Sequence, residues 1–341
     1  MASDATPGPT RRTTIRTVAA AAGVSTATVS RVMSGVPTVN PEIAERVRRI
    51  AEELAYRPSE AARGLVLGAG LRNIGTLMPD LGNAYFHDIV KGMHSGAAHS
   101  GFRLLIAEHS GDPGDERATA MDLMGHVDAL ALLSSRIDLA GLRDIARQPT
   151  PVVLVNRVEP GIDLPMVGVD SFTAMLEICA HLAELGHRRV VYLSGSERAW
   201  QDRERWRGVR TSERILGIEA TRVEADGTIE TSYAATEAAL SHEPTALVCF
   251  NDLAAIGAIS KLRELGLDVP GDISVSGFDD IAIAQHVFPA LTTATTPRDE
   301  IGRQAWELLH ASLDQRDLGE AVKLLPATLV TRQSTGTAKS R

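Results

Sequence analysis

Short apolar segments alternate with longer amphipathic segments throughout residues 72–335. Short apolar runs are typical of buried strands, whereas apolar residues at helical spacing indicate helices. The expected strands are 74–78, 103–107, 129–133, 151–155, 166–169, 190–193, 222–224, 246–250 and 273–277. The expected helices are 85–100, 116–124, 139–146, 172–185, about 205–213, 232–240, 253–265 and 300–313. This alternation predicts parallel sheets covered by helices on both faces, and the number of units predicts two α/β lobes.

A different pattern precedes this body, namely two short helices joined by a tight turn within residues 14–34. Thr14 can cap the first helix, which continues through an alanine run that favours helix. Gly23 permits the positive φ of a sharp turn, and Ser25 can cap the second helix. The second helix carries apolar residues on one face, at Val29, Val32 and Met33. This spacing predicts a helix with one buried face.

The opposite face of the second helix has small side chains and one cation. Its residues are Thr26, Ala27, Ser30 and Arg31. Such a face suits close approach to a DNA major groove, because hydroxyls can bind phosphates and a guanidinium can reach guanine. An ordinary helical hairpin with an exposed polar face is the alternative. The short gap that holds Gly23, and a third helix after it, favour DNA binding.

The third helix is expected after Asn40, which is a good cap, with Pro41 as its first residue. Its apolar residues form one stripe, at Ile43, Val47, Ile50 and Leu54. We expect this stripe to face the first two helices.

The charge distribution agrees with a DNA-binding N-terminal region. The net charge of the whole chain is −8, yet residues 1–64 contain nine arginines and only six acidic residues. This region therefore has a net charge of +3, and the remainder has −11. A basic region attached to an acidic body is typical of a chain that contacts DNA at one end.

The composition is that of a soluble globular protein, with 44% hydrophobic and 23% charged residues. No apolar run could span a membrane, and residues 1–12 lack the apolar core of a secretory signal. We expect a disordered tail at 1–12 and a cytoplasmic protein, nucleoid-associated when bound, with no membrane partner. Cys179 and Cys249 lie in apolar segments and are expected to be buried thiols rather than a disulfide or a metal pair.

Residues 18–32 closely resemble the helix-turn-helix of the LacI/GalR family of bacterial repressors, through the motif Val18-Ala-x3-Gly23-Val24-Ser25-x2-Thr28-Val29-Ser30-Arg31-Val32. The resemblance extends from about Thr13 to about Thr335. It implies an all-α helix-turn-helix head and an α/β two-lobed body like that of periplasmic binding proteins. The implied domains are a helix-turn-helix domain at 13–58, a hinge helix and linker at 59–71, an effector-binding and dimerisation domain at 72–335 and a tail at 336–341. The implied lobes are an N-lobe of about 72–169 and 296–324 and a C-lobe of about 170–293 and 325–335, with crossovers near Asp170, Thr293 and Pro326.

The resemblance also implies a hinge helix that orders on operator DNA and enters the minor groove. Leu65 matches the leucine that wedges between the central base pairs and bends the DNA. Ser59 stands where asparagine is common, and Glu60 and Gly64 depart from the usual pattern. The residues expected to contact DNA are Thr14, Ser25, Thr26, Ala27, Thr28, Ser30, Arg31, Ser59, Ala62 and Leu65.

Polar residues follow the expected strands of the body at the point where each strand ends. They are Asp80, Asn83, Asn156, Arg157, Asp170, Asn251, Asp252, Asp279 and Asp280. Ligands bind beyond the carboxyl ends of parallel strands, and two facing lobes would bring these residues to one cleft. Carboxylates and amides beside arginines suit the hydroxyls of a polyol or sugar. At each position the alternative is a cap for the next helix.

The resemblance implies roles for three polar residues and two aromatic ones. Arg205 matches an effector-clamping arginine, and Asn251 and Asp279 match positions that contact the effector. Tyr85 and Phe86 match an aromatic pair that lines the pocket.

One position departs from the family in the same region. Gly227 falls where many members carry an aromatic residue that closes over a sugar. We predict that Trp200, in the loop before Arg205, supplies that aromatic face instead. The expected effector-binding residues are Asp80, Tyr85, Phe86, Asn156, Arg157, Trp200, Arg205, Asn251 and Asp279.

No motif indicates catalysis, a cofactor or a metal site. His87 and His94 lie on one expected helix, but no acidic third ligand has suitable spacing. The sequence has no Gly-x-Ser-x-Gly elbow, no P-loop and no Gly-x-Gly-x-x-Gly after a strand. We therefore predict that the protein is not an enzyme.

Together these patterns predict a sequence-specific, DNA-binding transcriptional regulator, a repressor controlled allosterically by a small molecule. One short recognition helix cannot specify an operator, so we expect a homodimer on pseudo-palindromic double-stranded operator DNA. Residues 334–341 lack leucine heptads and so indicate no tetramerising coiled coil. A sugar is favoured as effector over a nucleoside or purine. The alternative is a solute- or sugar-binding protein of the periplasmic type, which would have a signal peptide and no DNA-binding region.

Overall fold

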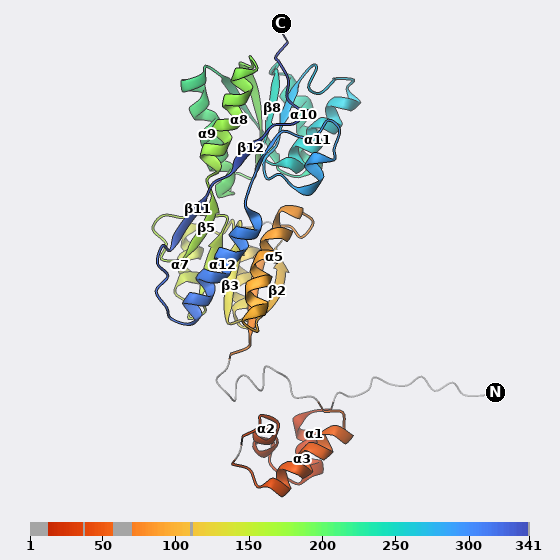
Figure 1. The fold of residues 1–341 in the computed structure, drawn as a ribbon, viewed down its shortest axis with the longest axis vertical. Helices are drawn as coiled ribbons and strands as arrows, with labels where there is room; N and C mark the ends of the chain where they lie inside the picture. Colours follow the sequence, from red (N-terminus) through yellow and green to blue (C-terminus); the bar gives the residue numbers. More distant parts are fainter. Residues whose placement is uncertain (1–12, 37, 57–69, 110–111, 340–341) are drawn as a thin grey trace, which may run out of the picture. The chain divides into compact units, whose positions relative to one another are not determined.

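The computed structural model describes residues 13–36, 38–56, 70–109 and 112–339. The chain divides into two compact units, Met1–Arg72 and Asn73–Arg341, which we call the N-terminal unit and the body (Figure 1). The predicted tail at 1–12 and the hinge residues Ser59, Ala62 and Leu65 lie outside the described residues. Among the residues that are described, no helix has both the length and the apolar content needed to cross a membrane.

The described part of the N-terminal unit folds into helices α1 (Ile15–Ala22), α2 (Thr26–Met33) and α3 (Pro41–Glu53). The three predicted caps are confirmed, because the side chains of Thr14, Ser25 and Asn40 each accept a hydrogen bond from a backbone N–H of the helix that follows. Gly23 has a φ of 62° and joins α1 to α2, as its freedom to adopt positive φ predicts.

The core of this unit contains Val18, Val29 and Val47, all fully buried. The predicted apolar stripe of α3 is displaced from the centre of this core. The buried residues of α3 are Ala44, Val47 and Ala51, whereas Ile43, Ile50 and Leu54 are half-buried beside them. The small alanines allow α3 to approach α1 and α2 closely, and the larger side chains then pack around the contact.

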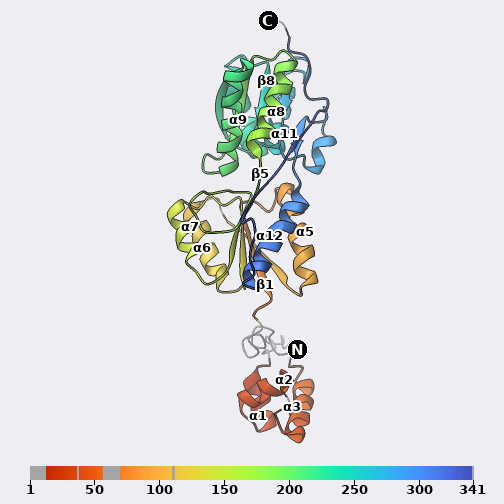
Figure 2. The ribbon, with the colours of Figure 1, turned by 60° about the vertical axis from the view of Figure 1, so that its left-hand side comes forward.

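The body contains two α/β lobes, each built on a parallel sheet (Figures 1 and 2). The N-lobe sheet has the strand order β11-β5-β4-β3-β1-β2. Its strands are β1 (Asn73–Met78), β2 (Arg103–Glu108), β3 (Ala129–Leu133), β4 (Val152–Val155), β5 (Met166–Val169) and β11 (Val322–Leu325). Its helices are α5 (Ala84–His99), α6 (Pro113–Met124), α7 (Leu139–Ala146) and α12 (Arg298–Leu313). Helices α5 and α12 cover one face of the sheet, and α6 and α7 cover the other.

The C-lobe sheet is also parallel, with the strand order β7-β6-β8-β9. Its strands are β6 (Arg189–Gly195), β7 (Glu219–Asp226), β8 (Ala246–Cys249) and β9 (Ser274–Ser276). Its helices are α8 (Ser171–Glu184), α9 (Trp200–Leu216), α10 (Ile229–Leu240), α11 (Asp252–Glu264) and the short 3-10 helix η1 (Ala282–Gln285). Alternate strand residues serve two cores, one beneath α8 and α9 and the other beneath α10 and α11. The predicted α/β body with sheets covered on both faces is confirmed.

The chain passes between the lobes after β5, after β10 (Thr293–Thr295) and after β11. Strand β10 pairs with β12 (Thr328–Val330) in an antiparallel ribbon. The sequence pattern did not predict β10, β11 or β12. These strands are short, and each pairs with a segment that is distant in the sequence or separated from it by a helix, so no local periodicity marks them.

Helix α9 begins at Trp200, which corrects the prediction that this residue lies in a loop before a helix at about 205. The residue before the helix is Ala199, and no side chain caps the first turn. The start of α9, like that of α12, therefore lacks the capping side chain found at the start of most helices of this chain.

Candidate functional site

The surface predicted to contact DNA lies on α2. Its residues Thr26, Ala27 and Arg31 are exposed, and Thr28 and Ser30 are half-buried. Val29 and Val32, on the opposite face, are buried in the core of the N-terminal unit. The helix therefore presents small polar side chains and one guanidinium to solvent.

Thr14 and Ser25 are also exposed, but their hydroxyl oxygens are engaged as helix caps. The hydroxyl of Ser25 lies 2.9 Å from that of Thr28. These hydroxyls hold the ends of α1 and α2 in place, and a hydroxyl that accepts from the backbone can still donate to a phosphate.

A cavity of about 240 Å³ lies between the two lobes of the body. It is lined where strands of both sheets end, which is where parallel sheets bind ligands. Seven of the nine predicted effector residues line it, namely Asp80, Tyr85, Phe86, Asn156, Arg205, Asn251 and Asp279. Its wall also contains residues that the sequence reasoning did not assign to the effector, among them Ser134, Arg136, Gln201 and Phe250.

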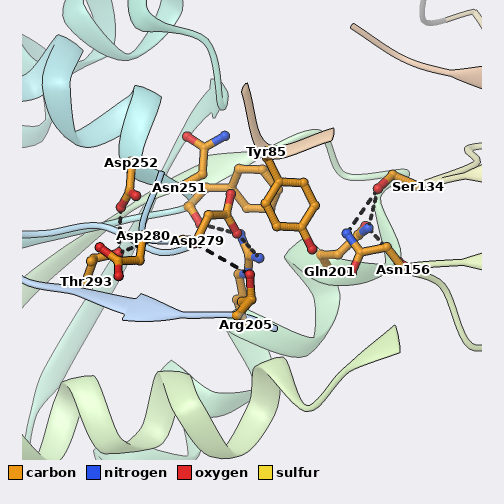
Figure 3. A network of polar contacts seen from close by, with 12 residues as sticks. Tyr85, Ser134, Asn156, Gln201, Arg205, Asn251, Asp252, Asp279, Asp280 and Thr293 are labelled. Carbon is orange, nitrogen blue, oxygen red and sulfur yellow. Dashed lines mark hydrogen bonds and ion pairs between the residues drawn. The ribbon is translucent and has the colours of Figure 1, made fainter. Parts of the chain in front are cut away.

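A buried ion pair joins Arg205 of α9 to Asp279 in the wall of this cavity (Figure 3). The Nη2 atom of Arg205 lies 3.0 Å from Oδ1 of Asp279, and Nη1 donates to the Phe250 carbonyl at 2.5 Å. The guanidinium plane lies over the rings of Phe250 and Phe278, with centroid distances of 4.6 and 3.8 Å. The buried Nε of Arg205 has no hydrogen-bond partner within the described residues. A ligand acceptor could satisfy this remaining N–H.

Two carboxyl groups in this region have raised pKa values because they are buried. Burial raises the pKa of Asp279 to about 6, although Arg205 and Arg298 oppose that rise. Burial, and then the negative charge of Asp279, raise the pKa of Asp252 to about 8. Asp252 accepts hydrogen bonds from the hydroxyl of Thr293 and the N–H of Ile281, so it holds the backbone next to Asp279. Asp252 is thus a structural residue, whereas Asp279 lines the cavity.

Gln201 connects the lobes inside the cavity wall (Figure 3). Its amide nitrogen donates to the Ser134 hydroxyl at 2.8 Å and to the Asn156 carbonyl at 2.5 Å. Ser134 and Asn156 follow strands of the N-lobe, whereas Gln201 belongs to the C-lobe. The buried Oδ1 of Asn156 has no hydrogen-bond partner in the part of the chain that the structure describes, so it is a further free acceptor at this wall.

Several residues of the cavity wall have left-handed backbone conformations. The φ angles are 49° at Ser134, 62° at Asn156 and 106° at Asp279. Such angles are costly for residues other than glycine and persist where the surrounding structure fixes them, typically at functional sites. The conformation turns the chain sharply soon after β3, β4 and β9, and these three residues themselves line the cavity.

Asn251 both caps a helix and lines the cavity, the two roles expected of a polar residue after a strand. Its Oδ1 accepts from the N–H of Ala254 at 2.8 Å and caps α11. The residue also lines the cavity, which leaves its amide nitrogen available to a ligand. The capping and ligand-binding alternatives therefore do not exclude each other here.

Two predicted effector residues do not line the cavity. Arg157 donates from Nη1 to the carbonyls of Ser135 and Ile137 and pairs with Glu159, so its guanidinium is used within the N-lobe. Trp200 packs towards Gly168 of β5, where its Cζ3 lies 3.7 Å from the position of a Cβ. Residues 201 and 205 are four apart and share one face of α9, which the preceding Trp200 does not share.

Phe250, and not Trp200, presents an aromatic ring to the cavity. It lines the cavity, and a Cβ placed on Gly227 would lie 2.6 Å from its ring. Gly227 has a φ of 81° and leaves the space that this ring fills. Phe250 ends an expected strand directly before Asn251, and this position is the sequence signal that points to the cavity.

Cys179 and Cys249 are buried and not bridged to each other, as predicted. Burial raises the pKa of Cys179 to about 11, so its thiol stays protonated. Among the described residues, no group of three or more histidine, cysteine or acidic side chains is arranged to hold a metal ion.

Comparison with known proteins decides the family. Residues 14–59 match the family described as "Bacterial regulatory proteins, lacI family", and residues 179–335 match the "Periplasmic binding protein-like domain". The HTH-type transcriptional repressor CytR of Escherichia coli (strain K12) is 33% identical over 329 residues, which cover 94% of this chain and 96% of CytR. The chain belongs to the lacI family of bacterial regulatory proteins. The resemblance seen in the helix-turn-helix motif is confirmed.

Solved structures of the family have the same architecture. The lac repressor dimer bound to operator and the anti-inducer ONPF is 26% identical to this lacI-family chain, with a TM-score of 0.77 over 96% of this chain and 100% of that one. The complex of the transcriptional regulator CelR with cellobiose is 27% identical, with a TM-score of 0.70 over 95% and 100%. This lacI-family chain is a DNA-binding transcriptional regulator with an effector-binding body.

Proposed function

We propose that this lacI-family regulator is a homodimeric repressor whose affinity for operator DNA changes when a sugar binds between its lobes. The buried pair of Arg205 and Asp279 is the observation that carries the proposal. A fixed guanidinium and carboxylate offer both donors and acceptors to sugar hydroxyls, and Phe86 and Phe250 offer apolar faces to a ring. The cellobiose bound to CelR supports a carbohydrate as the class of effector.

The volume of the cavity limits the size of the effector. Its volume of about 240 Å³ is below the range of pockets that hold drug-sized ligands. A single ring therefore fits this cavity better than a chain of several sugars.

The exposed face of α2 is the surface that enters the DNA major groove. Thr26 and Ala27 allow close approach, and Arg31 is long enough to reach guanine. Ser59, Ala62 and Leu65 stay predicted minor-groove contacts, since they lie outside the described residues.

Exposed apolar side chains on the body support a homodimer. Strand β2 is at the edge of the N-lobe sheet, and its residues Leu105 and Ile106 are exposed. In the C-lobe, Ile283 is exposed and Phe288 is 77% exposed. An uncovered apolar edge strand invites pairing with another chain, and a second copy would bury these residues. Two-fold symmetry then predicts a pseudo-palindromic operator.

Effector binding and DNA binding are coupled through the arrangement of the lobes. A ligand that closes the cavity changes how the two N-lobes of the dimer pack, and hence whether the paired hinge segments can order on DNA. Such coupling is reciprocal, because effector and operator must alter each other's affinity by the same factor. We propose that the protein acts in the cytoplasm, where its operator DNA is found.

The test begins with an operator selected from random duplex DNA by the full-length protein. Fluorescence anisotropy then follows operator binding during titration with a panel of pentoses and hexoses, with nucleosides included. We expect a pseudo-palindromic operator and one sugar that changes the operator Kd at least about tenfold, a typical coupling. Asp279→Asn should retain operator binding and lose the sugar response, and exposed Asp122→Asn should retain both. Selection of no preferred sequence would refute the proposal, and a response to nucleosides alone would replace the sugar.

A further inference from the structure

A second cavity lies next to the effector cavity, and Arg136 lines both. Its volume is about 630 Å³. Residues of the N-lobe around the start of α7 form one wall, and Glu197, Arg198 and Arg203 of the C-lobe form another. Five arginines and three carboxylates line it, so its charge is positive. A positive cavity beside an effector site is a place for an anionic group.

Three of these arginines are available to a ligand. Arg117 pairs with Asp144, and Arg157 pairs with Glu159. Within the described residues, no carboxylate forms an ion pair with the remaining three, which are Arg136, Arg198 and Arg203. One nitrogen of Arg203, Nη1, donates to the Arg198 carbonyl at 3.4 Å. Of the three lining carboxylates, Glu159 is used by Arg157, and Asp138 accepts from Gly141 at the start of α7. The third, Glu197, forms no ion pair within the described residues, so three unpaired arginines face one unpaired carboxylate. The guanidinium groups cannot lose their charge by deprotonation.

The backbone around Arg136 is held firmly on both sides. The N–H of Arg136 donates to the buried carboxylate of Glu116 at 2.8 Å. The flanking carbonyls of Ser135 and Ile137 accept from Arg157 at 2.9 and 2.7 Å. Arg157, which does not reach the effector cavity, is therefore a positioning residue for Arg136.

We propose that the second cavity binds a phosphate group, and that the effector is a phosphorylated sugar with its ring in the first cavity and its phosphate in the second. This proposal rests on the proposed function, since it names the class of sugar at the same site. Guanidinium groups bind phosphate oxygens in a bidentate manner. A phosphate presents three oxygens and nearly two negative charges to three guanidinium groups, whereas one arginine satisfies a carboxylate.

The same arrangement gives phosphate a role in closing the lobes. Arg136 belongs to the N-lobe, and Arg198 and Arg203 belong to the C-lobe. Their like charges repel when the lobes come together, and an anion between them offsets that repulsion. A phosphorylated sugar would thus favour the closed body more strongly than the sugar alone.

The test uses the full-length protein with inorganic phosphate and with four sugars as probes, namely ribose, ribose 5-phosphate, glucose and glucose 6-phosphate. Arg136→Gln with Arg198→Gln forms the test variant. Arg143→Gln is the control, because Arg143 is an exposed arginine of α7 that lines neither cavity. Thermal unfolding measures stabilisation by phosphate against chloride at equal ionic strength, and calorimetric titration measures the sugar affinities.

We expect phosphate to raise the Tm of the wild type and of the control, but not of the double variant. A phosphorylated sugar should bind at least about tenfold more tightly than its parent, and the double variant should lose that preference. A phosphate effect equal to that of chloride would overturn the phosphate site. Stabilisation by phosphate without preference for any phosphorylated probe would overturn the phosphorylated effector. An operator response to an unphosphorylated sugar would leave the proposed function standing in either case.

Discussion

Gln201 of the C-lobe donates from one amide nitrogen to the Ser134 hydroxyl of the N-lobe at 2.8 Å, deep inside the wall of the effector cavity. The same nitrogen donates to the Asn156 carbonyl. The residues that join the lobes, Gln201, Ser134 and Asn156, therefore also line the effector cavity. A ligand that touches this wall must also act on the relative position of the lobes, which is what an allosteric effector has to do.

Removal of this inter-lobe contact should loosen the body. We expect Gln201→Ala to lower the Tm by about 2–4 °C, since loss of buried hydrogen bonds costs about 1 kcal/mol in a domain of this size. Differential scanning calorimetry measures the change. Gln148→Ala is the matched control, because within the described residues the side chain of Gln148 bonds to the Asp144 carbonyl of the same lobe. Equal shifts for the two variants would show that Gln201 does not hold the lobes together.

The raised pKa of Asp279 should make stability depend on pH. The folded chain binds this proton more tightly than the unfolded chain, because burial raises the pKa from 3.8 to about 6. The contribution of Asp279 to the free energy of unfolding is therefore lost as the pH rises from 3.8 through about 6. His109 acts in the opposite sense, since burial lowers its pKa from 6.5 to about 4.

Urea unfolding across this pH range distinguishes the contribution of Asp279 to stability from that of His109. The difference in unfolding free energy between the wild type and Asp279→Asn should decline with rising pH, because His109 and Asp252 are present in both proteins. Exposed Asp122→Asn should show no such trend. A difference that stays constant with pH would mean that Asp279 keeps an ordinary pKa.

Gly227→Ala should impair effector binding through Phe250. Its added Cβ would lie 2.6 Å from the Phe250 ring, so the ring must move into the cavity. We expect effector affinity to fall about tenfold, since overpacking of a filled site costs about 1–3 kcal/mol. Gly161→Ala is the control, because Gly161 also has a positive φ but no atom lies near the position of its Cβ. Gly227→Ala should lose more stability than Gly161→Ala, because it adds a clash with Phe250 to the strain of a positive φ that both variants share. Unchanged affinity for Gly227→Ala would contradict the role of Phe250.

Arg31→Ala should weaken operator binding and relax its specificity. Loss of a guanidinium that reads guanine costs about 1–3 kcal/mol, which is about 5- to 150-fold in Kd. Binding to random DNA should fall much less, because backbone contacts dominate it. Arg49→Ala, at an exposed arginine of α3, should weaken both kinds of binding slightly and equally. Fluorescence anisotropy with selected and scrambled duplexes measures the ratio of the two Kd values. An unchanged ratio for Arg31→Ala would mean that Arg31 contacts phosphates and not guanine.

The effector cavity could be predicted in part because polar residues that follow parallel strands gather at the same edge of the sheet. Asp80, Asn156, Asn251 and Asp279 all reach the cavity in this way. Arg157 follows the same pattern, yet its guanidinium turns back to neighbouring carbonyls, and periodicity contains no information on that choice. Gln201 gave no signal at all, because the helix that carries it begins at Trp200 after Ala199, which has no capping side chain.

The sequence by itself determined the features that depend on neighbours along the chain. These are the caps and turn of the N-terminal helices, the alternation of strands and helices, and the basic charge of one end, all of which arise from short-range periodicity and composition. Tertiary structure alone decided which side chains meet across the lobes. The pair of Arg205 and Asp279 joins residues 74 positions apart, and Gln201 meets Ser134 over 67 positions. Such contacts depend on strand order and lobe closure, because they form only after many local elements have packed together.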